Sequence, residues 1–133
     1  MNKVKKVLLI IVVFLALLNC SNDDDITIIG KWKLVQVLAD PGDGSGVFRG
    51  IESNKTIEFF NDETFSSNGD FCFMTSSTDI ESAGTYSEFD NKIFVEACRN
   101  LAGTELSYRR QGKVLIISFF CFEACAQKFI KIN

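Results

Sequence analysis

The five cysteines are the residues of this sequence that could serve the widest range of chemistry. Cys20 stands alone near the start, and the other four are Cys72, Cys98, Cys121 and Cys125. Four cysteines in an exported chain are typical of two disulfides, for which three pairings are possible. Zinc is the competing use, but successive separations of 26, 23 and 4 residues lack the paired C-x-x-C spacing of zinc sites. We therefore expect disulfides and no bound metal.

This chain has few residues that are suited to acid–base or nucleophilic catalysis. The sequence contains no histidine, which removes the usual general base and the Ser-His and Cys-His nucleophile systems. Asp62 and Glu63 are adjacent acids, but neighbours in a turn are ordinarily solvated and not poised across a substrate. We expect no catalytic residue, no cofactor and no enzymatic activity.

The first residues have the outline of a signal peptide. Lys3, Lys5 and Lys6 precede the unbroken apolar run 7–18, and Cys20 follows after one polar residue. A run of 12 apolar residues is short for a transmembrane helix, which needs about 20. A permanent transmembrane anchor is therefore the weaker alternative, and we expect export.

The segment Leu17-Leu18-Asn19-Cys20 resembles the lipobox of bacterial lipoproteins. The resemblance implies that residues 1–19 are removed as a lipoprotein signal peptide. It also implies that acyl chains are attached to Cys20, so that the membrane becomes a partner of the protein. Several acyl chains on one cysteine give lasting attachment, whereas a single chain is marginal. The alternative is an ordinary secretory signal with an incidental cysteine.

An acidic run follows the cysteine at Asp23, Asp24 and Asp25. Three carboxylates cannot be buried without partners, so residues 20–27 are interpreted as a solvated tether. The run also resembles the acidic export signal that follows the lipidated cysteine in surface lipoproteins of Bacteroidetes. That resemblance implies an outer-membrane lipoprotein exposed at the cell surface. A spacer without a sorting role is the alternative.

Composition indicates one acidic domain, which we place at residues 28–133. Residues 1–19 hold three of the 14 Lys and Arg and none of the 17 Asp and Glu, so the remaining chain has 11 bases, 17 acids and a net charge near −6. An acidic domain without a basic stripe argues against nucleic acid as a partner.

Short runs of alternating apolar and polar residues, separated by Gly, Asn and Asp, predict an all-β domain from Gly30 onward. β-branched and aromatic residues are frequent, and proline occurs once. Eight strands are expected, at residues 30–39, 55–61, 63–68, 83–89, 92–98, 104–110, 113–120 and 126–132.

The lengths of the connections alternate along these strands. Tight turns at 61–63, 90–91 and 111–112 carry the residues that hairpins require. The connections after the first, third, fifth and seventh strands are longer. Alternate connections of an up-and-down antiparallel sheet lie at opposite ends, so we expect a hairpin end with the tight turns and a loop end with the long connections. Closing the sheet into a barrel removes its exposed edges, and eight strands leave room for side chains or for one small ligand.

Gly30-Lys31-Trp32, at the start of the first strand, resembles the Gly-x-Trp signature of lipocalins. The order of strands and the terminal pattern CFEACAQKFIKI are similar to those of small lipocalin-like lipoproteins of Bacteroidetes. The resemblance implies an antiparallel up-and-down meander of eight strands closed into a lipocalin-like barrel. It also implies a basic residue packed over Trp32, either Lys128 or Lys131.

Three phenylalanines fall in the long connections and are the candidate ligand-binding residues: Phe48, Phe71 and Phe73. Pockets form preferentially in barrel mouths, so these side chains indicate an entrance for a small apolar or amphipathic ligand. The alternative is that they fold inward and cap a solid core. Trp32 is expected to plug the hairpin end, although it could line a ligand cavity.

The four downstream cysteines all lie at or beside the expected loop end. We hypothesise that Cys121 pairs with Cys125 and Cys72 with Cys98, while Cys98–Cys121 with Cys72–Cys125 remains open. The predicted function is binding of a small ligand in the barrel mouth. Its rival is a filled barrel that serves as a protein-binding or structural module of the cell envelope, with an unknown partner.

Overall fold

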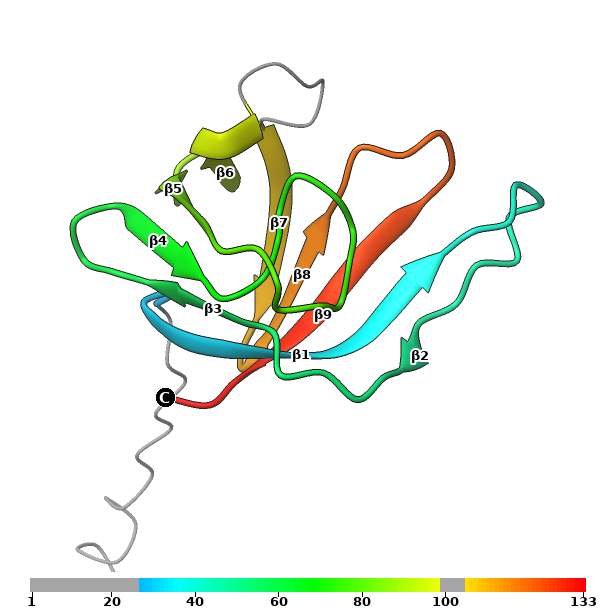
Figure 1. The fold of residues 1–133 in the computed structure, drawn as a ribbon, viewed down its shortest axis with the longest axis horizontal. Helices are drawn as coiled ribbons and strands as arrows, with labels where there is room; N and C mark the ends of the chain where they lie inside the picture. Colours follow the sequence, from blue (N-terminus) through cyan, green and yellow to red (C-terminus); the bar gives the residue numbers. More distant parts are fainter. Residues whose placement is uncertain (1–26, 99–104) are drawn as a thin grey trace, which may run out of the picture.

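The protein is a closed β-barrel in the computed structural model, which describes residues 27–98 and 105–133 (Figure 1). One short 3-10 helix, η1 (Glu96–Cys98), accompanies the strands. The strands are β1 (Gly30–Ala39), β2 (Arg49–Gly50), β3 (Thr56–Phe59), β4 (Thr64–Ser67), β5 (Ser82–Ser87), β6 (Lys92–Val95), β7 (Glu105–Gln111), β8 (Val114–Ser118) and β9 (Cys125–Lys131).

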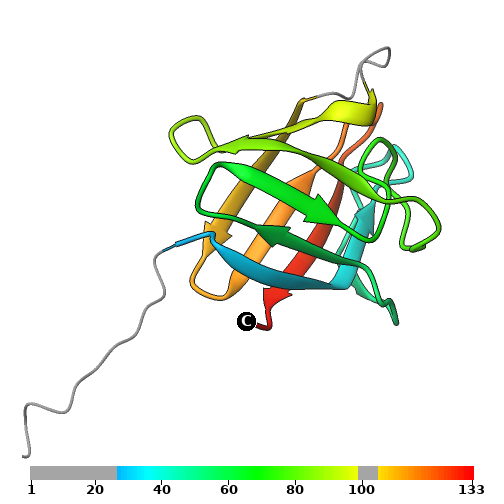
Figure 2. The ribbon, with the colours of Figure 1, turned by 60° about the vertical axis from the view of Figure 1, so that its left-hand side comes forward.

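Eight of these strands form the ring, each antiparallel to its neighbours, in the order β1-β3-β4-β5-β6-β7-β8-β9. The ring closes where β9 pairs with β1 along almost its whole length, from Trp32↔Lys131 to Ala39↔Cys125. The two-residue strand β2 pairs with Gln36 and Val37 of β1 and is not one of the eight strands of the ring. Figure 2 shows the curved sheet from a second direction. The expected eight-stranded up-and-down barrel is confirmed.

Three tight turns gather at one end of the barrel, and each contains a residue with positive φ. These residues are Glu63 (64°), Asn91 (55°) and Gly112 (55°). Hairpins of two or three residues need this conformation because it matches the twist of the strands, and Asn and Gly adopt it at least cost. This hairpin end also holds the start of β1 and the end of β9.

Side chains that alternate along the strands fill the interior. Trp32, Ile57, Ile93, Leu115 and Phe129 are each fully buried. Tyr86 lies edge-on to Phe59, with ring centres 5.0 Å apart, which is a favoured arrangement for aromatic pairs. The interior is therefore a packed hydrophobic core.

The observed strands correct several predicted boundaries. The strand expected at 92–98 ends at Val95, because the chain turns into η1 and brings Cys98 into the core. β2 was not predicted, since two exposed residues carry no alternation. Between Leu34 and Gln36 the pairing of β1 with β9 shifts by one residue, so Leu34 and Val37 both contact the core.

Residues 1–26 and 99–104 lie outside the described residues. The predicted signal peptide, lipid attachment at Cys20 and acidic tether at Asp23, Asp24 and Asp25 therefore stay predictions. Within the described ranges, no helix is long and apolar enough to cross a membrane.

Candidate functional site

A buried lysine lies in the mouth of the barrel at the loop end. Lys55 precedes β3 and points inward, in the same alternation as Ile57 and Phe59, and its side chain is fully buried. Its Nζ donates hydrogen bonds to the carbonyl oxygens of Asp70 (2.6 Å) and Thr75 (2.9 Å). A third bond, of 3.0 Å, goes to Oε1 of Gln127, a fully buried residue of β9. The lysine thus joins β3, the β4–β5 loop and β9.

Burial shifts the protonation equilibrium of Lys55 toward the neutral amine. Removal from water lowers the pKa of Lys55 to about 7, and the nearby Asp70 carboxylate opposes the shift. The aromatic face of Phe71 lies 4.1 Å from Nζ and favours a cation there. Near neutral pH both the ammonium and the neutral amine are therefore accessible forms of this group.

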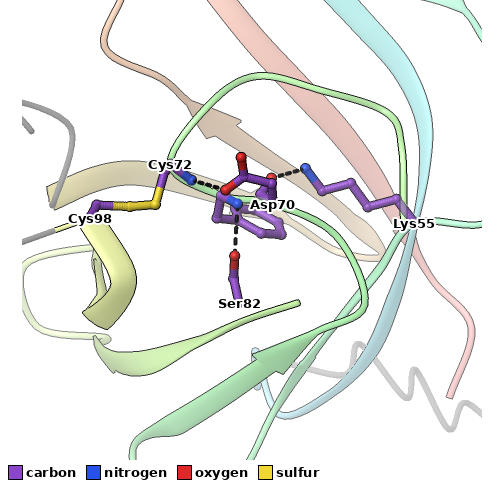
Figure 3. The surroundings of a disulfide bond; sticks show 6 residues. Lys55, Asp70, Cys72, Ser82 and Cys98 are labelled. Atoms are coloured by element: carbon purple, nitrogen blue, oxygen red, sulfur yellow. Dashed lines mark hydrogen bonds between the residues drawn. A yellow bond between two sulfur atoms is a disulfide. The ribbon is translucent and has the colours of Figure 1, made fainter. Parts of the chain in front are cut away.

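The β4–β5 loop, residues 68–81, folds into the mouth and covers the core (Figure 3). The Phe71 ring is fully buried, with its centre 5.9 Å from that of Phe119 and 6.0 Å from that of Phe129. Its backbone N–H donates to Ser82 Oγ at 2.9 Å. A Cβ at Gly69 would come within 2.6 Å of the Lys55 stem, so glycine lets the loop pass over the lysine. The loop is an integral part of the core.

Two disulfides hold the loop end. Cys72 in the β4–β5 loop is bonded to Cys98 of η1, and Cys121 is bonded to Cys125 across the β8–β9 connection. These are the hypothesised pairs, and the alternative pairing is wrong. Figure 3 shows the first bridge beside Asp70, whose Oδ1 accepts a hydrogen bond of 2.8 Å from the Cys72 N–H. The bridge therefore fixes the same loop that Lys55 contacts.

The structure places the three candidate ligand-binding phenylalanines in three different surroundings. Phe71 is part of the core, whereas Phe73 is 62% exposed on the outside of the loop. Phe48 lies on the outer wall, where Nζ of Lys128 is 4.1 Å from the centre of its ring. The β4–β5 loop lies in the mouth, and the expectation that these residues form an entrance for a ligand stays a prediction. The alternative, an inward residue that caps a solid core, applies to Phe71 alone.

The outside of the loop end carries exposed apolar side chains. They come from three connections, β1–β2, β4–β5 and β8–β9, and are Val47, Phe73, Ile80, Phe120 and Phe122. The first and third connections are in contact, since Asp40 N–H donates to the carbonyl oxygen of Ala124 at 2.9 Å. Water-exposed aromatic groups cost solvation free energy, so such a set is typical of a contact surface.

A groove of about 590 Å³ runs under the β8–β9 connection on the outer wall. Its apolar lining includes Leu38, Phe48, Ile116, Phe122 and Ala126. Arg109 and Glu123 contribute one charge of each sign. The groove is open to solvent and lies outside the barrel, so an occupant would contact strands and loop together.

The hairpin end is closed by Trp32. Its side chain is fully buried, and Nε1 donates a hydrogen bond of 2.8 Å to the carbonyl oxygen of Ile28. Nζ of Lys131 lies 5.5 Å from the centre of the indole. Of the two basic residues that the lipocalin resemblance allows, Lys131 is the one over Trp32, while Lys128 covers Phe48.

No family model matches the sequence, and neither the curated proteins nor the solved structures give a significant match. Among the described residues no cluster of three or more His, Cys, Asp or Glu is placed to hold a metal.

Sequence reasoning missed the group formed by Lys55, Asp70 and Gln127. A signal was present, because Lys55 and Gln127 both occupy inward positions of their alternating strands. A charged residue at an inward position needs buried acceptors, which is a reason to look for a polar site in the core. Two of the three acceptors are backbone carbonyls of a loop, and no residue type marks those.

Proposed function

We propose that this chain is a lipocalin-like lipoprotein of the kind found in Bacteroidetes, held on the outer membrane through acyl chains on Cys20. Its filled barrel serves as a protein-binding module, and the partner binds at the loop end. The membrane attachment is supported by the lipobox-like segment and the acidic run after it. The module is not an enzyme in this proposal, since the chain lacks histidine.

The observation that carries this proposal is the contrast between the core and the loop end. Phe71 and Lys55 are both fully buried in the mouth, which supports a filled interior there. Directly outside, Phe120 is 75% exposed and Phe122 is fully exposed. Aromatic residues are enriched at the centres of protein interfaces and dominate their binding energy. A partner that buries these rings would remove the unfavourable solvation free energy of their exposure.

Photo-crosslinking in cells tests the proposal. A benzophenone amino acid at Phe122 in the full-length protein should give a discrete protein crosslink after illumination. The matched control is Phe89, which is 94% exposed but lies in the β5–β6 turn at the hairpin end. Equal crosslinking at both positions, or none at Phe122, contradicts a partner site at the loop end.

A second candidate function rests on the outer groove, whose volume of about 590 Å³ suits a small apolar or amphipathic ligand. An environment-sensitive apolar fluorophore should then bind saturably and lose affinity in Phe48→Asp. Because Phe48 is half-buried on the outer wall, melting curves of the variant must show the fold intact. Binding that is unchanged in this variant excludes the groove as the site.

A further inference from the structure

One face of the barrel, at the hairpin end of β8, β9 and β1, combines lysines with exposed aliphatic residues. Val114 pairs with Ile130, and Ile130 pairs with Lys33, so these three side chains form one row on the outside. Their exposure is 36% for Val114 and 40% for Ile130. Ile132, 48% exposed, lies beside Lys31, to whose carbonyl oxygen it donates a backbone hydrogen bond of 2.8 Å.

The charge of this face is opposite to that of the protein. None of the strands β1, β8 and β9 contains Asp or Glu, although the whole chain has 17 acidic residues. Lys113, in the β7–β8 turn, is exposed directly beside the row, and its carbonyl oxygen accepts a hydrogen bond from the Lys131 N–H. Glu58 opposes Lys31 across the β1–β3 pair, which leaves Lys33 and Lys113 as the main positive charges. The acidic turn at 88–90 joins β5 and β6, across the ring from β9, whereas the acidic turn at 61–63 joins β4 to β3, the neighbour of β1.

The same face adjoins the point where the chain continues toward Cys20. Nζ of Lys131 donates to the carbonyl oxygen of Thr27 at 3.3 Å, so Thr27 lies next to the end of β9. Thr27 is seven positions after Cys20, and such a segment spans at most about 25 Å when fully extended. A lipid anchor on Cys20 would therefore hold this face close to the membrane surface.

We propose that this face, made of Lys31, Lys33, Lys113, Val114, Ile130 and Ile132, rests on an anionic membrane. The proposal depends on the lipid anchor of the proposed function and adds a second contact to it. Lysine side chains attract anionic headgroups, each favouring contact about fivefold, and the exposed aliphatic groups enter the interfacial region. The contact is too weak to hold the free domain, but the anchor raises its effective concentration at the surface. Docking through this face directs the loop end away from the membrane.

Lysine acetylation of the full-length, lipidated protein on vesicles tests the docking. The vesicles are phosphatidylcholine alone or phosphatidylcholine with one third phosphatidylglycerol, and mass spectrometry reports the rate at each lysine. Acetylation of Lys33 and Lys113 should be slower by about threefold or more on the anionic vesicles, and high salt should abolish the difference. Lys92 is the internal control, because it lies on β6, across the ring, and its side chain is 34% exposed.

A pair of variants checks the charge requirement. Lys33→Gln with Lys113→Gln should remove the protection of Lys31 on anionic vesicles. Arg49→Gln with Lys92→Gln removes the same charge elsewhere and should leave the protection intact.

Vesicle flotation separates the two proposals. Protein that does not float lacks the anchor, which overturns the proposed attachment and this inference with it. Protein that floats while its lysines react equally on both kinds of vesicle retains the anchor and overturns the docking face. If the lysines of the face are protected equally on neutral and anionic vesicles, their charge has no role in docking, which also overturns the proposal.

Discussion

The amino group of Lys55 lies 4.1 Å from the centre of the Phe71 ring, and both side chains are fully buried. The two residues are 16 positions apart in the sequence, one before β3 and the other in the β4–β5 loop. Their contact lies in the mouth of the barrel, under the β4–β5 loop. Phe71 supplies the apolar cap, and Lys55 binds the loop on both sides of it, through the carbonyl oxygens of Asp70 and Thr75.

Replacing Lys55 by Met should destabilise the domain by roughly 2–4 kcal/mol, because buried acceptor oxygens are left without a donor. Met retains the apolar stem under Phe71, so the loss reports the hydrogen bonds and not the packing. Urea unfolding followed by circular dichroism measures the change. Lys92→Met is the matched control, since its surface ion pair with Glu105 is worth about 0–1 kcal/mol. Equal effects of the two substitutions contradict the role assigned to Lys55.

The stability should rise with pH between about 7 and 10.5. The pKa of Lys55 is lowered from 10.5 to about 7 by burial, so within this window the unfolded chain binds a proton that the folded chain has released. The slope approaches at most about 1.4 kcal/mol per pH unit. Below pH 7 both states bind the proton, and the dependence disappears.

Unfolding free energies between pH 7.5 and 9.5 check this slope. The upper limit avoids Tyr108, because burial raises its pKa to about 12 and its ionisation acts in the opposite direction above pH 10. Lys55→Met should have a flatter profile than the wild type. A wild-type profile that falls with pH in this range contradicts the lowered pKa.

The two disulfides should contribute unequally to stability. Cys72–Cys98 closes a segment with a separation of 26 residues, and its removal by double Ser substitution should cost about 3.5 kcal/mol in the chain-entropy picture. Cys121–Cys125 has a separation of 4, for which the same picture gives about 2 kcal/mol. Urea unfolding of both variants measures the difference, and non-reducing peptide mapping checks the bridge that remains. A larger loss for the Cys121–Cys125 variant contradicts this ranking.

Lipidation at Cys20 is expected from the lipobox-like segment. Metabolic labelling with a fatty acid should mark the wild type and leave Cys20→Ser unlabelled. Cys72→Ser with Cys98→Ser serves as the control for loss of cysteine in general, and it should label like the wild type. Equal labelling of wild type and Cys20→Ser contradicts the anchor.

Display at the cell surface is expected from the acidic run. Protease added to intact cells should degrade the wild-type domain, whereas the combined Asp23→Ala, Asp24→Ala and Asp25→Ala variant should be retained inside and protected. The fatty-acid label should be present in both proteins. Equal degradation of the wild type and the triple variant would mean that the acidic run is only a spacer.

The barrel was determined by two local signals, the alternation of buried and exposed side chains along the strands and the residue types in the turns. A strand with one buried face has a period of two, so Ile57 and Phe59, or Leu115 and Phe129 on paired strands, indicate their own orientation. Asn91 and Gly112 marked hairpins because their backbones adopt positive φ at low cost. The parity of the connections followed from these local rules, and it brought the four cysteines to one end, where the two hypothesised bridges are found.

Only the tertiary structure decided what fills the mouth. The sequence presents Phe71 and Phe73 as equivalent loop residues, yet the first is buried and the second is exposed. Their difference depends on the path of an irregular loop, and that path is fixed by Lys55, Gln127 and the Cys72–Cys98 bridge, which are distant in sequence. Periodic rules describe contacts within a strand pair, but they contain no information about which loop oxygens will meet a buried amine. The sequence therefore determined the barrel and its two ends, and the tertiary structure decided which of the loop residues is buried in the mouth.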